Sequence, residues 1–232
     1  MAALAGDRPV LEVDAGTGKA TLMFAERGVP VTAVEPSAEM AAVARRACGA
    51  FPQVRIEEDD FEHWDARGQT FPLIFAAQSW HWVQVPVGFT KAAGLLELGG
   101  VLAAFWNRPI WPEARARDAL ARAYQLAAPH LDPADDPMHP ENQFNDDNAD
   151  WSEPVVETDG LHQPEVRSYG SVHTYSTDAY VQLLGTHSAV RIMPPAQRAA
   201  LLDAIASAIA SHGETIALPM RTQLCLARQT TT

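Results

Sequence analysis

Short apolar runs alternate with amphipathic stretches over the first part of the chain. Residues 10–13 form an apolar run before a glycine-rich turn, which predicts a buried strand. Residues 19–27 carry apolar side chains at helical spacing and are followed by Gly28, a residue type that commonly ends helices. A second apolar run follows at residues 29–34. The pattern therefore predicts a βαβ unit with a glycine turn between its first strand and its helix.

The alternation continues along the rest of the chain. We expect helices over residues 37–48, 86–96, 112–128, 177–184 and 194–212, with Ser37 and Thr177 as N-caps, and strands over 54–56, 71–77, 101–106, 166–175 and 214–227. Residues 132–154 are rich in Asp, Asn and Pro and predict a loop. Strands that alternate with helices predict an α/β fold: a doubly wound, mostly parallel sheet with helices on both faces.

Composition narrows the class of protein. The chain has 232 residues, enough for one domain with a sizeable core, and 47% of them are hydrophobic. A formal net charge of -12 works against binding a polyanion, so we expect a small-molecule partner and no nucleic acid. Cys48 and Cys225 lack metal or redox spacing and predict buried thiols in a reducing compartment. No apolar run has membrane-spanning length and no signal peptide is recognisable, so we expect a cytoplasmic protein without a membrane partner, either monomer or homodimer.

The turn after the first strand has the composition of a ligand loop. Gly16 and Gly18 let the backbone approach a ligand closely, and the helix that follows offers free N–H groups. Glu35 ends the second strand, where a carboxylate can hold a ribose diol. Thr21 occupies the place of the third glycine in the dinucleotide fingerprint. A nicotinamide-dependent oxidoreductase is therefore the less favoured alternative.

The same loop resembles motif I, E/D-x-G-x-G-x-G, of class I S-adenosylmethionine-dependent methyltransferases. Glu12, Gly16 and Gly18 match this motif, whereas Asp14 stands where its first glycine is expected. The segment 78–82, Gln-Ser-Trp-His-Trp, resembles the A-Q-x-W-H-W segment of a subgroup that acts on small molecules, and residues 105–107 and 183–188 extend the resemblance. It covers essentially the whole chain after Pro9.

The resemblance implies an activity, a cofactor and a set of site residues. It implies methyl transfer from S-adenosylmethionine to a small-molecule acceptor, without a metal, on a seven-stranded sheet with one antiparallel strand near the C-terminus. It also implies a single methyltransferase-like domain over residues 1–232, with a helix and loop lid inserted at about 108–165. The cofactor residues expected on this basis are Glu12, Asp14, Ala15, Gly16, Thr17, Gly18, Glu35, Pro36, Met40, Asp60, Phe61 and Gln78. On the acceptor side we expect Trp80, Trp82, Trp106 and Asn107, with His81 as a general base.

Several of these residues also have ordinary structural interpretations. Asp60 with Phe61 can form a solvated acidic turn instead of an adenine site, and Trp80 and Trp82 can pack in the core. His81 can hydrogen-bond to a neighbouring loop. The calcium-loop pattern of Asp146, Asn148, Asp150 and Glu157 is interrupted by Trp151 and Pro154, so we interpret it as an acidic loop.

Asp14 leads to an alternative hypothesis about the function of the chain. A non-glycine residue strains this turn by about 1–2 kcal/mol if its φ is positive. Its carboxylate would also repel the carboxylate of the cofactor's methionine by about 1–4 kcal/mol. Methyltransferases of this kind usually carry helices before motif I, which this sequence leaves no room for. The alternative is therefore a methyltransferase-fold binding protein with impaired catalysis.

Overall fold

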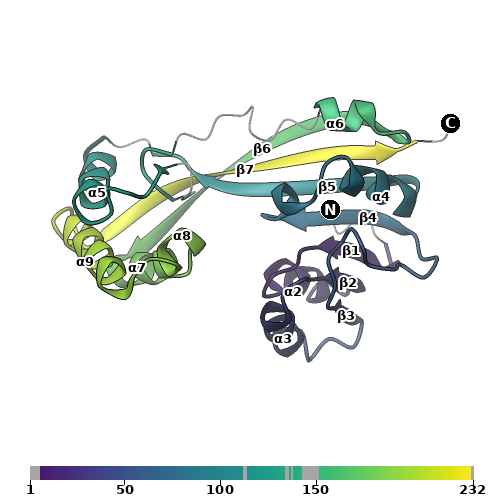
Figure 1. Ribbon diagram of the computed structural model, residues 1–232, viewed down its shortest axis with the longest axis horizontal. Coiled ribbons are helices and arrows are strands. Elements are labelled where there is room, and N and C mark those ends of the chain that lie inside the picture. The colour runs from purple at the N-terminus through teal and green to yellow at the C-terminus, as the bar shows by residue number, and fades with distance from the viewer. Residues whose placement is uncertain (1–5, 112–113, 134–135, 137, 143–151, 231–232) are drawn as a thin grey trace. The chain divides into compact units, whose positions relative to one another are not determined.

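The computed structural model describes residues 6–111, 114–133, 136, 138–142 and 152–230 (Figure 1). Its contacts group the chain into two compact units. The first unit takes in residues 1–106, 149–167 and 223–232, and the second takes in residues 107–148 and 168–222. The predicted insertion at 108–165 therefore falls in both units, with residues 108–148 in the second and residues 149–165 in the first.

A mixed, mostly parallel sheet organises the first unit. The strands are β1 (Val10–Val13), β2 (Val31–Val34), β3 (Val54–Glu57), β4 (Phe71–Ala77), β5 (Leu96–Pro109), β6 (Leu161–Ser176) and β7 (Thr215–Gln229), in the sheet order β3-β2-β1-β4-β5-β7-β6. Parallel pairing joins β3, β2, β1, β4 and β5. The strand arrows show β7 running opposite to β5 and β6 (Figure 1). The predicted doubly wound, mostly parallel α/β fold is confirmed, with its antiparallel strand near the C-terminus.

Alternate residues of the central strands line two covered faces. Leu73 and Phe75 of β4 belong to a core cluster with Val10, and the ring of Phe75 stacks on Phe24 at a centroid distance of 4.4 Å. Ile74 lies between them in sequence and is also fully buried. Strands buried on both faces read as continuous apolar runs, which is why residues 71–77 are found as β4 with the predicted bounds.

Helices connect the parallel strands of the first unit. These are α2 (Lys19–Ala25), α3 (Ala38–Ala47), α4 (Val87–Leu95) and the 3₁₀ helix η1 (Trp80–Trp82), and α6 (Ser152–Glu157) precedes β6. Ser37 caps α3 as predicted, because its Oγ accepts a hydrogen bond of 3.3 Å from the Met40 N–H. η1 is not foreseen by the sequence pattern, since its three residues are too few to show a period.

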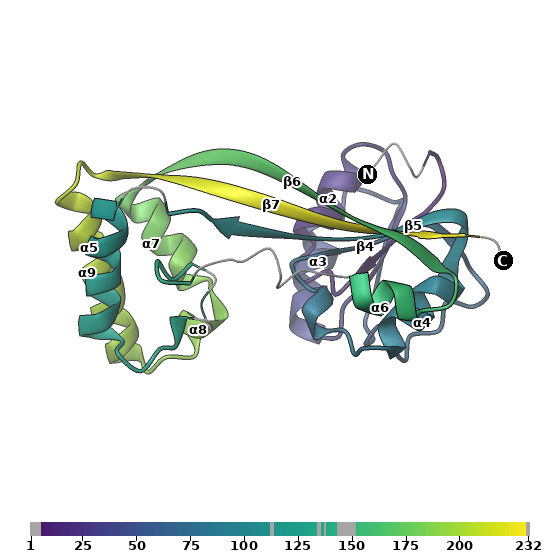
Figure 2. The same ribbon diagram turned by 90° about the horizontal axis from the view of Figure 1, so that it is seen from above.

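The second unit is built mainly of helices. It contains α5 (Ala114–Ala127), α7 (Thr177–Gly185), α8 (Ser188–Arg191) and α9 (Pro195–Ala210). α5 and α9 lie side by side (Figures 1 and 2) and bury a shared cluster that includes Leu120, Tyr124 and Ile205. No described helix is long and apolar enough to cross a membrane.

A buried carboxylate ties the parts of the second unit together. The Tyr124 hydroxyl donates to Asp136 over 2.8 Å, the Met138 N–H donates over 3.0 Å, and His187 Nδ1 lies 3.4 Å away. Burial alone would raise the pKa of Asp136, but hydrogen bonds from His187, Met138 and Tyr124 hold that pKa below its ordinary value. Asp136 is therefore a satisfied structural carboxylate.

Several local expectations are corrected. Ser176, not Thr177, caps α7, because the Ser176 Oγ accepts from the Ala179 N–H at 3.2 Å. The predicted loop 132–154 overlaps the start of α6, and α8 is not foreseen at all. β5 and β6 extend beyond the predicted bounds. Asp146, Asn148 and Asp150 of the calcium-like pattern lie outside the described residues, whereas Cys48 and Cys225 are buried as expected.

Candidate cofactor and acceptor site

The carboxyl ends of β1, β2 and β4 meet at one edge of the sheet and are linked there by hydrogen bonds. The Ala15 N–H donates to Val34 O over 3.1 Å, joining the loop after β1 to β2. The Ser79 hydroxyl donates to Val13 O over 2.9 Å, joining the turn after β4 to β1. Ligands of open α/β sheets bind outside this edge. The glycine loop and the segment 78–82 therefore share the position expected of a binding site.

Backbone conformation explains the glycines of the loop. Gly16 has φ 59° and Gly18 has φ 81°, both in the left-handed region. A Cβ on Gly18 would lie 3.0 Å from the Ala44 Cβ, so this glycine also permits α2 to approach α3 closely. Asp14 has φ 52°, which meets the condition under which it strains the turn.

Glu35 joins the loop to the start of α3. Its side chain is buried, Oε2 accepts from the Gly16 N–H over 2.7 Å, and Oε1 accepts from the Ser37 N–H over 2.8 Å. Each carboxylate oxygen retains a second lone pair after these bonds. Glu35 is therefore held in one orientation at the edge of the sheet, where the sequence predicts a ribose carboxylate.

Glu12 lies beneath the loop rather than in it. The side chain is 1% exposed, and the Thr21 hydroxyl donates to its Oε2 over 2.5 Å. The pKa of Glu12 is raised to about 8. Burial is the largest cause of this rise, the Thr21 hydrogen bond acts against it, and the charge of Glu35 contributes to it. This contact ties β1 to α2, so Glu12 supports the loop from below.

Asp14 faces a group of carboxylates. Its pKa is raised to about 6. Burial is the largest cause of this rise, and the charges of Glu35, Glu62 and Asp60 are the others. A carboxyl group with a pKa raised this far is unusual, and such groups concentrate at functional sites.

Asp60 and Phe61 lie in different environments. Asp60 is accessible, and its Oδ1 accepts from the His63 N–H over 3.0 Å and lies 2.6 Å from His63 Nδ1. Phe61 is fully buried, with its ring centroid 6.0 Å from that of Trp80 and the Lys91 Nζ 5.5 Å above it. The Asp60 carboxylate can therefore face a ligand, whereas the Phe61 ring supports the turn from the core.

The aromatic segment after β4 likewise contains both buried and exposed rings. Trp80 is buried and packs edge to face on Phe89, with 5.2 Å between ring centroids. Trp80 therefore packs in the core, which is the structural alternative given above. Trp82 is 74% exposed, and its ring lies 4.9 Å from the ring of the exposed His81. Trp106 Nε1 donates to His81 Nδ1 over 3.2 Å. Trp82 and His81 are thus the aromatic members of this segment that reach solvent.

The remaining expected residues occupy varied positions. Thr17, Pro36, Met40 and Gln78 are exposed, Ala15 is buried, and Gln78 has φ 67°. Asn107 belongs to the second unit, where its Oδ1 accepts from the Thr222 hydroxyl over 2.6 Å. Sequence reasoning did not single out Glu62, His63 or Lys91. The acidic run at 57–60 was the signal that could have led to Glu62 and His63, because these residues follow it closely.

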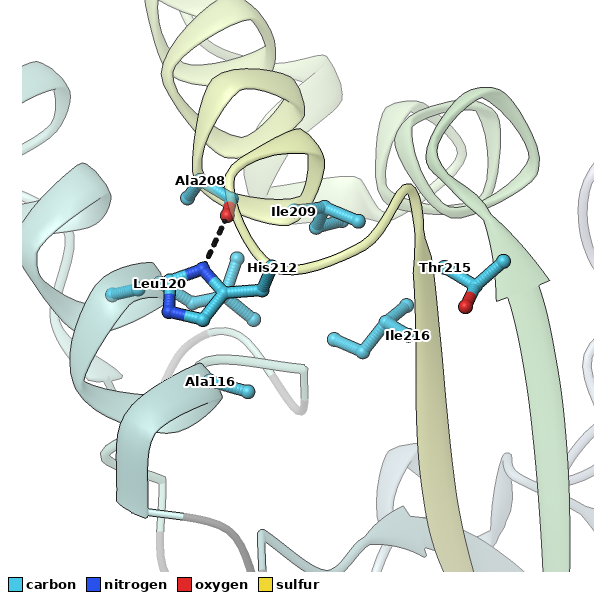
Figure 3. A pocket seen from close by; sticks show the side chains of 8 residues that line it. Ala116, Leu120, Ala208, Ile209, His212, Thr215 and Ile216 are labelled. Atoms are coloured by element: carbon cyan, nitrogen blue, oxygen red, sulfur yellow. Dashed lines mark hydrogen bonds between the residues drawn. The ribbon is translucent and has the colours of Figure 1, made fainter.

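A separate small pocket lies in the second unit, between α5, α9 and the start of β7 (Figure 3). Its walls are mostly small or aliphatic: Ala116, Ala119, Leu120, Ala208, Ile209, His212, Thr215 and Ile216. His212 Nδ1 lies 2.8 Å from Ala208 O, the bond drawn in Figure 3. Since a carbonyl can only accept, Nδ1 of His212 carries a proton. Most of the groups that face this pocket offer only apolar contact.

Part of the first unit is similar to known proteins. The profile of a family described as a methyltransferase domain matches residues 10–100. An uncharacterised methyltransferase of Mycobacterium tuberculosis is 37% identical over 103 residues, which are 44% of this chain and 41% of that protein. The chain thus spans less than half the length of this curated relative.

Solved structures share the fold at low sequence identity. A putative type II methyltransferase from Anaeromyxobacter dehalogenans superposes with a TM-score of 0.67 at 20% identity, over 100% of this chain and 94% of that one. Haemonchus contortus phosphoethanolamine N-methyltransferase 2, solved with S-adenosylhomocysteine, gives 0.53 at 13% identity, over 96% of this chain and 49% of that one. Residues 10–100 are thus similar to a methyltransferase domain, and the solved structures share the fold of this chain.

Proposed function

We propose that this protein binds S-adenosylmethionine at the carboxyl edge of β1, β2 and β4 and transfers its methyl group to a small-molecule acceptor. The observation that carries the proposal is the Glu35 carboxylate, fixed by the N–H groups of Gly16 and Ser37. A carboxylate at the end of the second strand is suited to a ribose diol, because it accepts from two hydroxyl groups at once. The similarity of residues 10–100 to a methyltransferase domain adds independent support.

The residues at this edge suit the parts of such a cofactor. Gly16 offers a loop with no side chain in the way, and Asp60 offers an accessible carboxylate for an amino group on the adenine. When bound, the cofactor supplies a methyl group on a positively charged sulfonium. A protein adds little covalent chemistry to such a transfer. Its residues need mainly to hold the acceptor in line and keep water out.

Asp14 is the residue that fits least well. Its carboxylate shares the edge with Glu35, Glu62 and Asp60, so the site already concentrates negative charge. An ammonium group of the ligand gains from that charge, whereas a carboxylate of the ligand loses. We therefore expect Asp14 to weaken cofactor binding by about tenfold without abolishing it, which makes an active enzyme the preferred function over a binding protein with impaired catalysis.

Thermal unfolding with added ligands tests the proposal. A ligand that binds only the folded state raises the unfolding temperature, so S-adenosylmethionine and S-adenosylhomocysteine should each stabilise the native protein. The oxidised and reduced forms of NAD serve as comparison ligands. Stabilisation by the nicotinamide cofactors alone would overturn the methyltransferase proposal in favour of an oxidoreductase.

A further inference from the structure

The segment between β4 and α4 exposes three large apolar side chains. Trp82 is 74% exposed, Val85 is 62% exposed and Val87 is 47% exposed. Single exposed apolar residues are ordinary, but large ones that follow one another within a short segment are typical of a binding surface. We call these three residues the exposed apolar segment.

Hydrogen bonds fix the exposed apolar segment at the ligand edge of the sheet. The Trp82 N–H donates to Ser79 O over 2.9 Å, and the Ser79 hydroxyl donates to Val13 O, at the end of β1. On the other side of Trp82, the Gln84 N–H donates over 2.7 Å to Oε1 of Glu62. The segment is therefore held both to the loop after β1 and to one of the carboxylates of this edge.

The charge at this edge is negative. Asp14 interacts electrostatically with three further carboxylates, those of Glu35, Asp60 and Glu62. In the proposed function Glu35 holds the ribose and Asp60 holds the adenine, so two carboxylates remain for another ligand. Lys91 offsets part of the charge, but its Nζ donates to the backbone carbonyl of Glu62 and forms no ion pair with a carboxylate of the described residues. A cationic ligand therefore complements this edge, whereas an anionic ligand is repelled.

We propose that the methyl acceptor is an amine on an apolar skeleton, with the skeleton packed on the exposed apolar segment and the nitrogen near the carboxylates of Asp14 and Glu62. The inference rests on the proposed function, whose acceptor it names. The exposed apolar segment accounts for the skeleton, because covering it removes apolar surface from water. The carboxylates account for the nitrogen, and the exposed indole of Trp82 also attracts a cation to its face.

Methyl transfer to an amine suits the same charges. The bound ammonium form first gives one proton to water. The nitrogen lone pair then forms the bond to the methyl carbon, the carbon–sulfur bond breaks, and the electron pair of that bond stays on sulfur. The positive charge moves from sulfur to nitrogen, so the products are a methylated ammonium ion and a neutral thioether. Carboxylates beside the acceptor stabilise the charge that develops on its nitrogen.

The first arm of the test compares three probe ligands by calorimetric titration into the protein saturated with S-adenosylhomocysteine. Phenethylamine carries both a ring and an ammonium group, phenylacetate keeps the ring and reverses the charge, and ethylamine keeps the ammonium group without the ring. We expect phenethylamine to bind about tenfold or more tightly than either of the others. Absence of phenethylamine binding, or equal or tighter binding of phenylacetate or ethylamine, would overturn the inference.

The second arm assigns the contributions of charge and apolar surface to residues. Glu62→Gln removes the charge and keeps an oxygen that can accept from the Gln84 N–H, and Glu26→Gln removes the same charge at an exposed residue at the end of α2. We expect Glu62→Gln to bind phenethylamine about fivefold more weakly and phenylacetate more tightly, Glu26→Gln to bind both as native does, and Trp82→Ala to bind phenethylamine about tenfold more weakly. A purely structural effect of Glu62→Gln would weaken both ligands alike, and that result would overturn the inference, as would native affinity of Trp82→Ala.

Titration of S-adenosylhomocysteine alone separates this inference from the proposed function. Absence of S-adenosylhomocysteine binding overturns the proposed function and, with it, the inference. Binding of S-adenosylhomocysteine together with a preference for phenylacetate overturns the inference alone.

Discussion

Oε2 of Glu35 lies 2.7 Å from the backbone N–H of Gly16, across the boundary between β2 and the loop that follows β1. Together with the Ser37 bond to Oε1, this contact makes one buried carboxylate hold two loops at the ligand edge of the sheet. Such a carboxylate is pre-organised, since its orientation is set before a ligand arrives. The contact also means that substitution of Glu35 acts on the loop as well as on the ligand, so controls for folding are needed.

The charge of Asp14 should make cofactor binding depend on pH. Its pKa of about 6 lies above the ordinary value of 3.8, so Asp14 is charged above about pH 6 and neutral below it. Repulsion of the ligand carboxylate is therefore present at about pH 7.5 and lost as the pH falls. We expect Asp14→Gly to bind S-adenosylhomocysteine about tenfold more tightly than native at about pH 7.5, and within about twofold near pH 5. Calorimetric titration at both pH values checks this.

Asp14→Asn provides the matched control, because it removes the charge and keeps a side chain that tolerates positive φ. It should bind as Asp14→Gly does. If native protein binds as tightly as both variants at about pH 7.5, or if the difference grows as the pH falls, Asp14 does not repel the ligand.

Gly18 should be far less tolerant of a side chain than Gly16. Both have positive φ, but an added Cβ at Gly18 would lie 3.0 Å from the Ala44 Cβ, whereas at Gly16 it would meet no atom within 4 Å. We expect Gly18→Ala to lower the free energy of unfolding by about 3 kcal/mol and Gly16→Ala by about 1 kcal/mol. Urea denaturation measures both, and equal losses would contradict the close packing of α2 on α3.

The sequence predicted the first unit best, for reasons that lie in its residues. Leu73, Ile74 and Phe75 are buried on both faces of the sheet, so their apolar run marks β4 without ambiguity. The polar residues at 107 and 108 gave no sign in the sequence that β5 continues beyond residue 106. Next to the end of β5, the Ile110 N–H donates a hydrogen bond of 2.7 Å to Pro219 O of β7. That partner is distant in the chain, and local patterns carry no information about it.

The candidate site was predicted less evenly. The position of Glu35 follows from strand order alone, and the structure places it at the loop as expected. An aromatic residue just after a strand, by contrast, has the same pattern whether it lines a site or fills the core. Phe61 and Trp80 are in the core, while Trp82, two residues further on, is exposed. Only the tertiary packing of Phe61 and Phe89 around Trp80 decides between the two.

Because Glu12 is buried, the folded protein should become less stable as the pH rises. Its folded-state pKa of about 8 exceeds the ordinary 4.5, so the unfolded chain gives up this proton at lower pH than the folded protein does. The contribution of Glu12 to the free energy of unfolding is therefore fully present below about pH 4.5. The free energy of unfolding then falls by roughly 3 kcal/mol between about pH 5 and pH 8. Glu12→Gln stays neutral and should lack this loss. Urea denaturation of both proteins near pH 5 and pH 8 measures it, and parallel pH dependence of the two would show that Glu12 is not held neutral.

Calorimetric titration of S-adenosylhomocysteine into native protein, Glu35→Gln and Glu26→Gln tests the central claim most directly. Glu26 is an exposed residue at the end of α2, so its variant removes the same charge away from the site. We predict micromolar binding by native protein and Glu26→Gln, and binding at least about tenfold weaker by Glu35→Gln, with all three equally folded by circular dichroism. Equal affinity of Glu35→Gln and native protein, or no binding by a folded native protein, would contradict the assignment of this edge as the cofactor site.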